Sequence, residues 1–594
     1  MKFPYGISHF ASIRIEGYYY CDRTDRIPKM EEAGKYLLFI RPRRFGKSLW
    51  LSTLRHYYDI AMKERFQTLF GELAIGKNPT LLHNKYLVLQ WDFSCVDPTG
   101  SVDAMRQALH DHINMRIRGF ARYYKEIIGK DISINPQNAL DSFGELLSIA
   151  QQLALPFYLF IDEYDNFANE LMSGIRNSDE NYKLMVHEKG PLKTLFKSLK
   201  SSAGEGAIER MFITGVSPVV LSDITSGFNI AENIYLKPMF NDLCGFTEAE
   251  VEKIFEEVAF KCSLENPESK KDDALSLMRT YYNGYSFAPA DICKIYNPTL
   301  ALYFIKAFQE DALYPREMLD ANLASDEAKL EFIAALPGGR QLLLEIVRES
   351  EPVVVTGISS RFGISAMIDD VEKNKDFLIS FLYYFGVLSI SKLTESGQIE
   401  MRVPNLVTRG LYVNQTAKFL LPNPLDRDAG KAAAEPVFTK GDIAPLCNFV
   451  EQRYFKVFRN ADYKWANELT VKTAFLTLLY DDIRYIMDSE HEVGRGYADL
   501  TMIIRPDMRK YALLDVLIEF KYVKLSEAGI TGNDARDLSH DEIKGLPIMQ
   551  SRMVEAKEQA RRYSAELEKK YKSLRLRTFA VVSLGFERIW GEIA

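Results

Sequence analysis

Largely apolar runs alternate with longer polar and amphipathic segments through the first third of the chain. The runs that predict strands occupy residues 36–39, 86–93, 156–161 and 210–215. Nearly continuous apolar residues, rather than apolar residues at every second position, are typical of strands buried on both faces. The pattern therefore predicts an α/β fold with a parallel sheet and helices on both of its faces.

A different pattern follows between residues 300 and 420. Helical periodicity dominates at first, and residues 376–385 then predict a buried helix. Two short strands are expected at 387–390 and 399–403, on either side of a turn-rich acidic segment. A helix followed by a hairpin resembles a winged helix, which can bind DNA or serve as a structural lid. The acidic hairpin tip favours the structural role.

Residues 421–436 contain several Pro, Gly and Ala residues and predict a linker. Beyond it, the strand-like segments 497–504 and 511–521 flank a polar turn and predict a β-hairpin. We therefore expect three domains, listed in chain order as residues 1–310, 311–425 and 437–594.

The composition is that of a large globular protein. The chain has 594 residues, of which 47% are hydrophobic and 26% are charged, and its formal net charge is -7. Because the net charge is negative, contact with nucleic acid requires a local basic surface. The most apolar run, 377–390, is shorter than the roughly 20 residues of a membrane span, and the N-terminus shows no cleavable signal.

Cysteine usage predicts a cytoplasmic location. The six cysteines show no C-x-x-C pairing, which is typical of reduced core residues rather than of zinc ligands or a disulfide framework. They are Cys21, Cys95, Cys244, Cys262, Cys293 and Cys447.

The segment IRPRRFGKSL, from Ile40 to Leu49, follows the first apolar run directly. A strand, such a loop and then a helix are the parts of a phosphate-binding loop, in which backbone N–H groups and the helix N-terminus hold phosphates. Lys47 is expected to contact phosphate oxygens and Ser48 to bind Mg²⁺. Arg41 stands where the usual pattern has its first Gly. The alternative is that Gly46 is a plain turn beside a solvated lysine.

Two adjacent acids, Asp162 and Glu163, follow the apolar run at 156–161. Because carboxyl ends of parallel strands lie beside the phosphate loop, Asp162 is expected to hold Mg²⁺ through water and Glu163 to polarise the attacking water. The alternative is an acidic start to a surface loop. Thr214 ends the fourth run and is a candidate sensor of the γ-phosphate, with Ser217 behind it. A plain strand cap explains Thr214 equally well.

These segments resemble the bacterial AAA-ATPase-like family, whose phosphate loop commonly has the sequence RPRRFGKS. The resemblance covers roughly the first half of the chain and includes YYCDRT at 19–24, FTEAE at 246–250, YNGYSF at 282–287 and YNP at 296–298. Arg41 is then a family trait, whereas Cys21 and Arg23 replace the family's usual Val and Lys. Spacing does not reveal what the aromatic motifs contact, and a core or turn role explains them as well as a ligand role. The expected ATP-binding residues are Arg43, Arg44, Phe45, Gly46, Lys47, Ser48, Asp162 and Thr214.

Two carboxylates and a lysine converge in the predicted C-terminal hairpin. Glu519 and Lys521 are two positions apart and project to the same side, and Asp499 lies on the partner strand within a few residues of register. Because Mg²⁺ prefers oxygen ligands, we expect Asp499, Glu519 and the Phe520 carbonyl to hold it while Lys521 positions the hydrolytic water. The alternative is an exposed strand face, but the apolar neighbours 516–518 make buried charges costly unless they serve a site.

An Asp followed by E-x-K resembles the PD-(D/E)XK nuclease superfamily, whose domains often form the C-terminus of the AAA-ATPase-like proteins. In that light Glu468 matches the superfamily's helical acid and Gln559 a helical Gln of some branches, while Ala498 replaces the usual Pro before Asp499. Alternatively, Glu468 is a helix N-terminal charge favoured by the helix dipole and Gln559 a surface residue.

The sequence thus predicts an ATP-hydrolysing module coupled to a Mg²⁺-dependent DNA nuclease. The alternative is an ATP-operated switch or scaffold whose nuclease-like domain binds nucleic acid or protein without cutting it. A homo-oligomer stays open. The expected catalytic residues are Glu163, Glu468, Asp499, Glu519, Lys521 and Gln559. The expected Mg²⁺ ligands are Ser48, Asp162, Asp499 and Glu519.

Overall fold

The computed structural model describes residues 1–97, 101–166, 190–218, 220–221, 228–261, 267–289, 293–311, 313–319, 327–348, 352–359, 375–458, 468–493, 496–571 and 573–594. The chain divides into two compact units. The first comprises Met1–Ala312, Asn322–Gly338 and Val354–Pro404, and the second comprises Leu313–Ala321, Gly339–Val353 and Asn405–Ala594. The boundaries of three domains near residues 310, 425 and 437 stay a prediction.

A five-stranded parallel sheet is the centre of the first unit, with the strand order β2-β3-β4-β1-β5. Its strands are β1 (Tyr36–Ile40), β2 (Leu87–Asp92), β3 (Phe157–Asp162), β4 (Arg210–Gly215) and β5 (Glu232–Asn233). Every position of β3 and β4 is buried, as continuous apolar runs predict for strands covered on both faces. The four predicted strands are confirmed, and β4 lies between β1 and β3.

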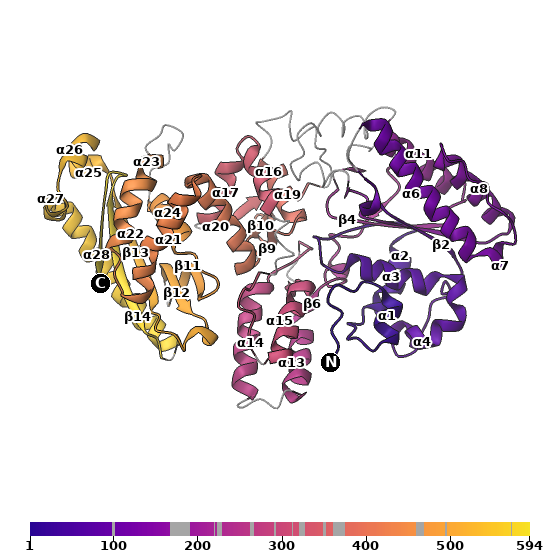
Figure 1. Cartoon of the computed structure of the whole chain (residues 1–594), viewed down its shortest axis with the longest axis horizontal. Coiled ribbons are helices and arrows are strands. Elements are labelled where there is room, and N and C mark those ends of the chain that lie inside the picture. Colours follow the sequence, from indigo (N-terminus) through magenta and orange to yellow (C-terminus); the bar gives the residue numbers. More distant parts are fainter. Residues whose placement is uncertain are drawn as a thin grey trace. The chain divides into compact units, whose positions relative to one another are not determined.

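Helices cover both faces of this sheet. Figure 1 shows α1 and α3 on one side and α6, α8 and α11 on the other. The helices of this part are α1 (Phe10–Ile15), α2 (Ile27–Ala33), α3 (Lys47–Tyr58), α4 (Phe66–Phe70), α5 (Ala74–Lys77), α6 (Val102–Tyr123), α7 (Lys125–Ile128), α8 (Ala139–Gln152) and α11 (Pro191–Gly204).

The remainder of the first unit is mostly helical. It contains α13 (Glu248–Lys261), α14 (Pro267–Tyr282), α15 (Pro298–Asp311), α16 (Glu327–Ala335) and α19 (Lys375–Tyr384). A small sheet pairs β6 (Phe246–Thr247) with β7 (Ile295–Tyr296), and another has the order β8-β10-β9, with β8 at Val353–Val355, β9 at Ser389–Leu393 and β10 at Ile399–Arg402. The predicted buried helix followed by an antiparallel hairpin is confirmed as α19, β9 and β10.

The second unit is a mixed sheet flanked by helices, with the strand order β11-β12-β13-β14-β15. The strands are β11 (Tyr485–Val493), β12 (Gly496–Ile504), β13 (Asp515–Val523), β14 (Leu576–Leu584) and β15 (Arg588–Ile593). The helices are α17 (Gly339–Arg348), α20 (Leu406–Leu420), α21 (Pro424–Thr439), α22 (Ala444–Phe449), α23 (Phe455–Phe458), α24 (Glu468–Leu479), α25 (Leu525–Ala528), α26 (Gly532–Asp537), α27 (His540–Gly545) and α28 (Pro547–Lys570). The predicted hairpin is confirmed, because β12 and β13 pair antiparallel while β13 and β14 pair in parallel.

The predicted linker at 421–436 is wrong, because most of it forms helix α21. The Asn423 side chain accepts a hydrogen bond from the Leu425 N–H and caps the helix, and Pro424 occupies the first helical position. Proline is well tolerated there, since its missing N–H has no partner in a first turn. The alanines that follow are strong helix formers.

The described cysteines are all free, but they are not all core residues as predicted. Cys95 and Cys293 are exposed, Cys21 is half-buried, and Cys244 and Cys447 are buried. Cys262 lies outside the described residues. Among the described helices, none is both long and apolar enough to cross a membrane.

Candidate functional site

The loop after β1 bends back over the N-terminus of α3. Gly46 caps this helix in the left-handed region with φ +91°, and Arg44 also has a positive φ of 65°. The Lys47 ammonium donates to the backbone carbonyls of Arg41 (3.0 Å) and Pro42 (3.1 Å). Burial lowers the pKa of Lys47. The loop thus encloses a buried cation, held by its own carbonyl oxygens.

Asp162, at the end of β3, faces the start of α3. Its Oδ2 accepts a hydrogen bond from the Ser48 hydroxyl (2.7 Å), and its Oδ1 accepts one from the Thr214 hydroxyl. The three predicted residues therefore meet at one point, and Thr214 does more than end a strand. Ser217 does not join them, because its hydroxyl and N–H donate to Asp165 instead.

Glu163 follows Asp162 with a positive φ of 48°, an uncommon conformation for a residue other than glycine. Burial raises the pKa of its carboxyl, while the charges of Lys47 and Arg43 act in the opposite direction. The strained backbone and the raised pKa are features that cluster at functional sites. Glu163 thus lies within the electrostatic reach of the phosphate loop.

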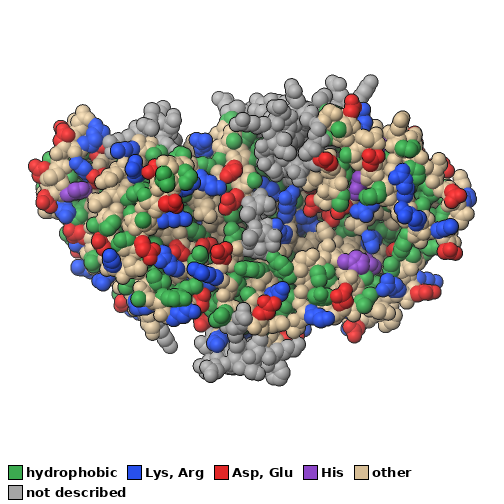
Figure 2. Space-filling view, in the orientation of Figure 1, with side chains coloured by type: hydrophobic (Ala, Val, Ile, Leu, Met, Phe, Trp, Pro, Cys, Tyr) green, Lys and Arg blue, Asp and Glu red, His purple; other side chains and the backbone are tan. Residues whose placement is uncertain are grey.

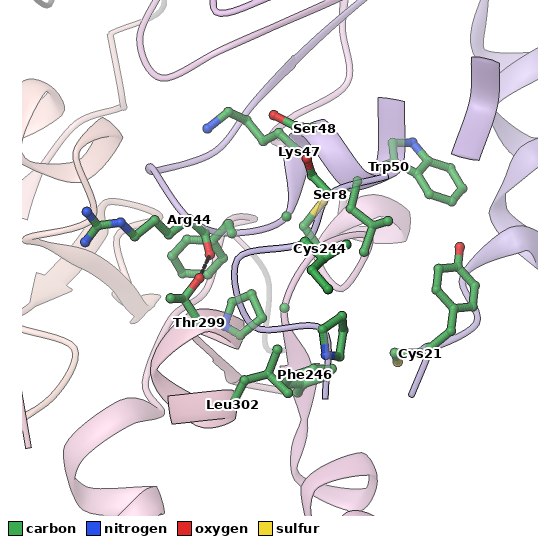
Figure 3. Close-up of a pocket in the computed structure, with 18 of the residues that line it drawn as sticks. Ser8, Cys21, Arg44, Lys47, Ser48, Trp50, Cys244, Phe246, Thr299 and Leu302 are labelled. Carbon is green, nitrogen blue, oxygen red and sulfur yellow. Dashed lines mark hydrogen bonds between the residues drawn. The ribbon is translucent and has the colours of Figure 1, made fainter. Parts of the chain in front are cut away.

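A pocket of about 350 Å³ opens beside this loop. Figure 3 shows Arg44, Lys47 and Ser48 at its rim, with Trp50, Phe246 and Leu302 lining the remainder. Of the predicted ATP-binding residues, Arg44, Phe45, Gly46, Lys47 and Ser48 line the pocket, and Glu163 also does so. Aromatic and apolar walls next to a few polar groups are typical of small-molecule sites.

Arg41, at the position of the usual first Gly, has a structural role. It is 1% exposed, and its guanidinium donates to the backbone carbonyls of Ile40, Tyr235 and Phe240 at 2.6–2.9 Å. It also stacks on the ring of Phe287, with its Cζ 4.2 Å from the ring centroid. Arg41 therefore ties the end of β1 to segments that lie about 200 residues further along the chain.

Two aromatic residues of the YNGYSF motif pack against the phosphate loop. The Phe45 ring packs edge-on against Tyr285 and Phe287, with centroid distances of 4.9 and 5.2 Å. The Thr299 hydroxyl, next to the YNP motif, donates to the Arg44 carbonyl (2.9 Å), as Figure 3 shows. The sequence pattern gave no signal of these contacts, because they join residues about 250 positions apart.

The other motifs of the resemblance also contact one another. The Arg23 guanidinium forms an ion pair with Glu250, which also accepts hydrogen bonds from the Cys21 thiol (3.0 Å) and the Thr247 N–H (2.8 Å). The segments YYCDRT and FTEAE are therefore adjacent. The Tyr296 hydroxyl donates to Glu248 (2.6 Å).

In the second unit, Asp499 on β12 lies beside Glu519 on β13. The neighbouring pair Leu500 and Ile518 are in register, and the Asp499 N–H donates to Glu519 Oε1 (3.2 Å). The Phe520 N–H donates to Asp499 Oδ2 (2.8 Å). Burial and then the charge of Asp499 raise the pKa of Glu519. The two acids therefore meet as predicted, and they share a buried position.

The remaining predicted residues surround this pair. The Lys521 ammonium donates to Gln559 Oε1 (2.8 Å) on α28, so Gln559 is more than a surface residue. Glu468 is the first residue of α24 and does not contact Asp499 directly. Instead, the Lys472 ammonium lies 3.4 Å from Glu468 Oε1 and 2.5 Å from Asp499 Oδ1. Lys472 was missed, although its spacing of four residues from Glu468 places the two on one helix face.

A Mg²⁺ ion fits the donor set of both sites. Ser48 with Asp162, and Asp499 with Glu519, supply the oxygen ligands that this ion prefers. Glu519 is fully buried and its Oε2 has no hydrogen-bond partner among the described residues. No group of three or more His, Cys, Asp or Glu side chains is assembled as a metal cluster within the part of the chain that the structure describes.

Comparisons with known proteins agree with this geometry. Residues 4–225 match the family of predicted AAA-ATPases, and residues 466–592 match the PD-(D/E)XK nuclease superfamily. A protein of Azotobacter chroococcum mcd 1, described as an uncharacterized protein in the vnfD 5' region, is 27% identical over 320 residues. That match covers 51% of this chain and 52% of the relative, so this chain spans about half the length of the curated protein it matches.

Solved structures show weaker similarity. The Walker-type ATPase of Pyrococcus abyssi is 15% identical with a TM-score of 0.35, covering 66% of this chain and 95% of that one. The ORC1 protein of Aeropyrum pernix in complex with DNA is 11% identical with a TM-score of 0.26, covering 68% of this chain and 95% of that one. The family matches carry the assignment: the chain combines an AAA-ATPase-like domain with a C-terminal domain of the PD-(D/E)XK nuclease superfamily.

Proposed function

We propose that the first unit binds and hydrolyses ATP with Mg²⁺. The observation that carries this proposal is the meeting of Ser48, Asp162 and Thr214 beside the buried Lys47. When bound, Mg²⁺ would draw charge from the phosphate oxygens. Ser48 and Asp162 would hold it, because the Ser48 hydroxyl and the Asp162 carboxylate can exchange the hydrogen bond between them for bonds to a metal.

The proposed role of Lys47 requires its ammonium group to change its hydrogen-bond acceptors. Its ammonium would leave the carbonyls of Arg41 and Pro42 and contact phosphate oxygens instead. Glu163, whose pKa burial raises, would orient the attacking water and accept its proton. Thr214 would sense the γ-phosphate through the Asp162 carboxylate, to which it donates. The adjoining apolar pocket has room for a base and sugar.

For the second unit we propose Mg²⁺-dependent cleavage of DNA. Asp499, Glu519 and the Phe520 carbonyl would hold the ion, which would lower the pKa of a bound water when present. Lys521, kept in place by Gln559 at 2.8 Å, would orient that water and neutralise charge at the phosphate. Arg561 and Arg562 are exposed on the same helix as Gln559 and offer cations to the DNA backbone.

A local basic contact of this kind is needed because the wider surface is mixed. On the face drawn in Figure 2, Lys and Arg side chains alternate with Asp and Glu across the described surface. Binding to DNA would therefore depend on few phosphates, and its affinity would fall only modestly as salt is added, because the salt dependence scales with the number of phosphates contacted.

A second candidate function is a switch whose nuclease-like domain binds without cutting. The contact of the Lys472 ammonium with Asp499 favours it, because a cation already satisfies one of the two acids. For both functions we propose a cytoplasmic location. The partner would be DNA for the nuclease, and nucleic acid or protein for the switch. ATP would couple the units by favouring different arrangements of them.

Purified protein incubated with linear, circular and single-stranded DNA, with and without Mg²⁺ and ATP, separates these functions. Mg²⁺-dependent cutting that disappears in Asp499→Ala supports the nuclease. ATP hydrolysis and DNA binding without cutting, in Mg²⁺ and in Mn²⁺, supports the switch.

A further inference from the structure

Asp499 and Glu519 form the acid pair of the second unit. Among the described residues, Lys472 is the one cation whose side chain forms an ion pair with a carboxylate oxygen of this pair. It lies one helical turn after Glu468 on α24, with its ammonium 3.4 Å from Glu468 Oε1 and 2.5 Å from Asp499 Oδ1. Its side chain is 17% exposed and that of Asp499 is 11% exposed. The ammonium therefore bridges a helix and a strand at the edge of the site rather than deep within it.

The hydrogen bonds of the acid pair leave one oxygen without a partner. Asp499 Oδ1 accepts from Lys472, Asp499 Oδ2 accepts from the Phe520 N–H, and Glu519 Oε1 accepts from the Asp499 N–H. Glu519 Oε2 is buried and accepts from no described group. Three of four carboxylate oxygens are thus satisfied by the protein, and the Lys472 ammonium supplies the only one of these bonds that carries positive charge.

We propose that Lys472 is a built-in counter-ion that occupies the cation position between Glu468 and Asp499 until a divalent metal displaces it. This inference rests on the proposed metal site of the second unit. An ammonium has only donors and cannot share a ligand oxygen's lone pair with a metal, and two cations a few ångströms apart repel. Metal entry at Asp499 therefore requires the ammonium to withdraw, and its flexible stem and partial exposure give it a route to solvent.

The consequence is a lower metal affinity than the carboxylates alone would provide. With Lys472 neutralised, Asp499 would present a free oxygen and the metal would meet no competing charge. The opposite result follows if Lys472 merely holds the acids in place, because its removal would then separate Glu468 from Asp499 and weaken metal binding.

Mn²⁺ titration of the nucleotide-free full-length protein, followed by electron paramagnetic resonance, tests this directly. The part of the binding that disappears in Asp499→Asn belongs to this site rather than to the ATP site. Lys472→Met and Lys472→Gln are each expected to bind Mn²⁺ at this site about tenfold more tightly than wild type, since one neighbouring charge is removed. Lys472→Arg keeps the charge and should bind as wild type does.

Lys557→Met is the matched control. Lys557 forms a similar, partly buried ion pair with Glu592 (2.7 Å) on β15 and has no contact with the acid pair. It should leave Mn²⁺ affinity unchanged. Thermal unfolding of each variant checks that the second unit is folded.

The outcomes are distinct. Tighter Mn²⁺ binding by both Lys472→Met and Lys472→Gln than by wild type supports the proposal that Lys472 is a counter-ion. Binding by both variants where wild type shows none also supports it. Equal or weaker binding in these variants, with the Asp499-dependent part still present in wild type, overturns the inference but keeps the metal site. Absence of Asp499-dependent binding from wild type and from both variants overturns the inference together with the proposed metal site.

Discussion

The two acid sites of this chain differ in what satisfies their carboxylates. Asp162 in the first unit accepts hydrogen bonds from the neutral hydroxyls of Ser48 and Thr214. Asp499 in the second unit accepts from the Lys472 ammonium, and its neighbour Glu519 retains an oxygen without a partner. Both sites lie on strands of an α/β sheet. The aspartate accepts hydrogen bonds from neutral hydroxyl groups in the first site and from a positively charged ammonium group in the second.

This difference changes what a metal ion must do to enter. At Asp162 it exchanges places with hydroxyl groups that can themselves become ligands or bind water. At Asp499 it must displace a charge, and it must find Glu519 in its ionised form, although burial and then the charge of Asp499 raise the pKa of that carboxyl. We therefore expect the first site to bind its metal together with nucleotide. The second site is expected to bind its metal less readily.

The largest expected effect concerns the second site. Asp499→Ala and Glu519→Ala should each abolish DNA cleavage, because the ion loses a ligand and the water loses its activation. Lys521→Ala should also stop cleavage but retain metal, since an ammonium is not a ligand. Cleavage of labelled DNA and ATP hydrolysis are measured on the same preparations. Loss of ATP hydrolysis in Asp499→Ala would show that the effect is not local.

Next in size is the effect of Glu163→Gln on the first site. The amide keeps the shape but cannot orient and deprotonate water, so the rate of ATP hydrolysis should fall by about two orders of magnitude or more. ATP binding, measured with a fluorescent analogue, should remain, whereas Lys47→Ala should weaken it. Glu145→Gln, at an exposed position of α8, is the control and should hydrolyse at the wild-type rate. Wild-type turnover in Glu163→Gln would remove Glu163 from the mechanism.

A smaller effect is expected from the aromatic support of the phosphate loop. Phe287 packs against both Arg41 and Phe45, so Phe287→Leu should loosen the loop and raise the KM for ATP about tenfold with little change in kcat. Phe196→Leu removes a comparable buried ring that packs on Phe228, away from the loop. Similar losses of Tm in the two variants, with the KM changed only in Phe287→Leu, are the predicted pattern. A KM change of equal size in both variants would show that Phe287 contributes only to the core and not specifically to the phosphate loop.

The smallest effect concerns acid stability. Burial raises the pKa of Glu250, but the hydrogen bonds and charge of Arg23 outweigh it and lower this pKa from 4.5 to about 2. A carboxyl whose pKa is lower in the folded state stabilises the protein fully above pH 4.5, and that stabilisation is lost as the pH falls toward 2. Glu250→Gln should cost about 1–3 kcal/mol at neutral pH. The free energy of unfolding, measured with urea, should differ less between pH 7 and pH 3 for this variant than for wild type.

Much of both sites could be predicted from sequence because the signals are local. Strands β1, β3 and β4, the loop at Lys47 and the acids after β3 all follow from short apolar runs and the residues that end them. The meeting of Asp499 with Glu519 required only a hairpin and its approximate register.

What could not be predicted depends on contacts between distant segments. The packing of Phe45 on Tyr285 and the bonds from Arg41 to Tyr235 and Phe240 have no local pattern. Lys472 is a different case, because its i, i+4 spacing from Glu468 was visible in the sequence. Its contact with Asp499 depends on how α24 packs against β12, which spacing does not fix.

The most direct test of the account is the rate of Mg²⁺-dependent DNA cleavage by Glu163→Gln with saturating ATP, compared with the same protein without nucleotide. This variant is expected to hold ATP without consuming it, so any change in rate reports the bound state alone. We predict that the two rates differ and that both vanish when Asp499→Ala is added. Equal rates, or no cleavage in either Mg²⁺ or Mn²⁺ while ATP remains bound, would contradict an ATP-gated nuclease.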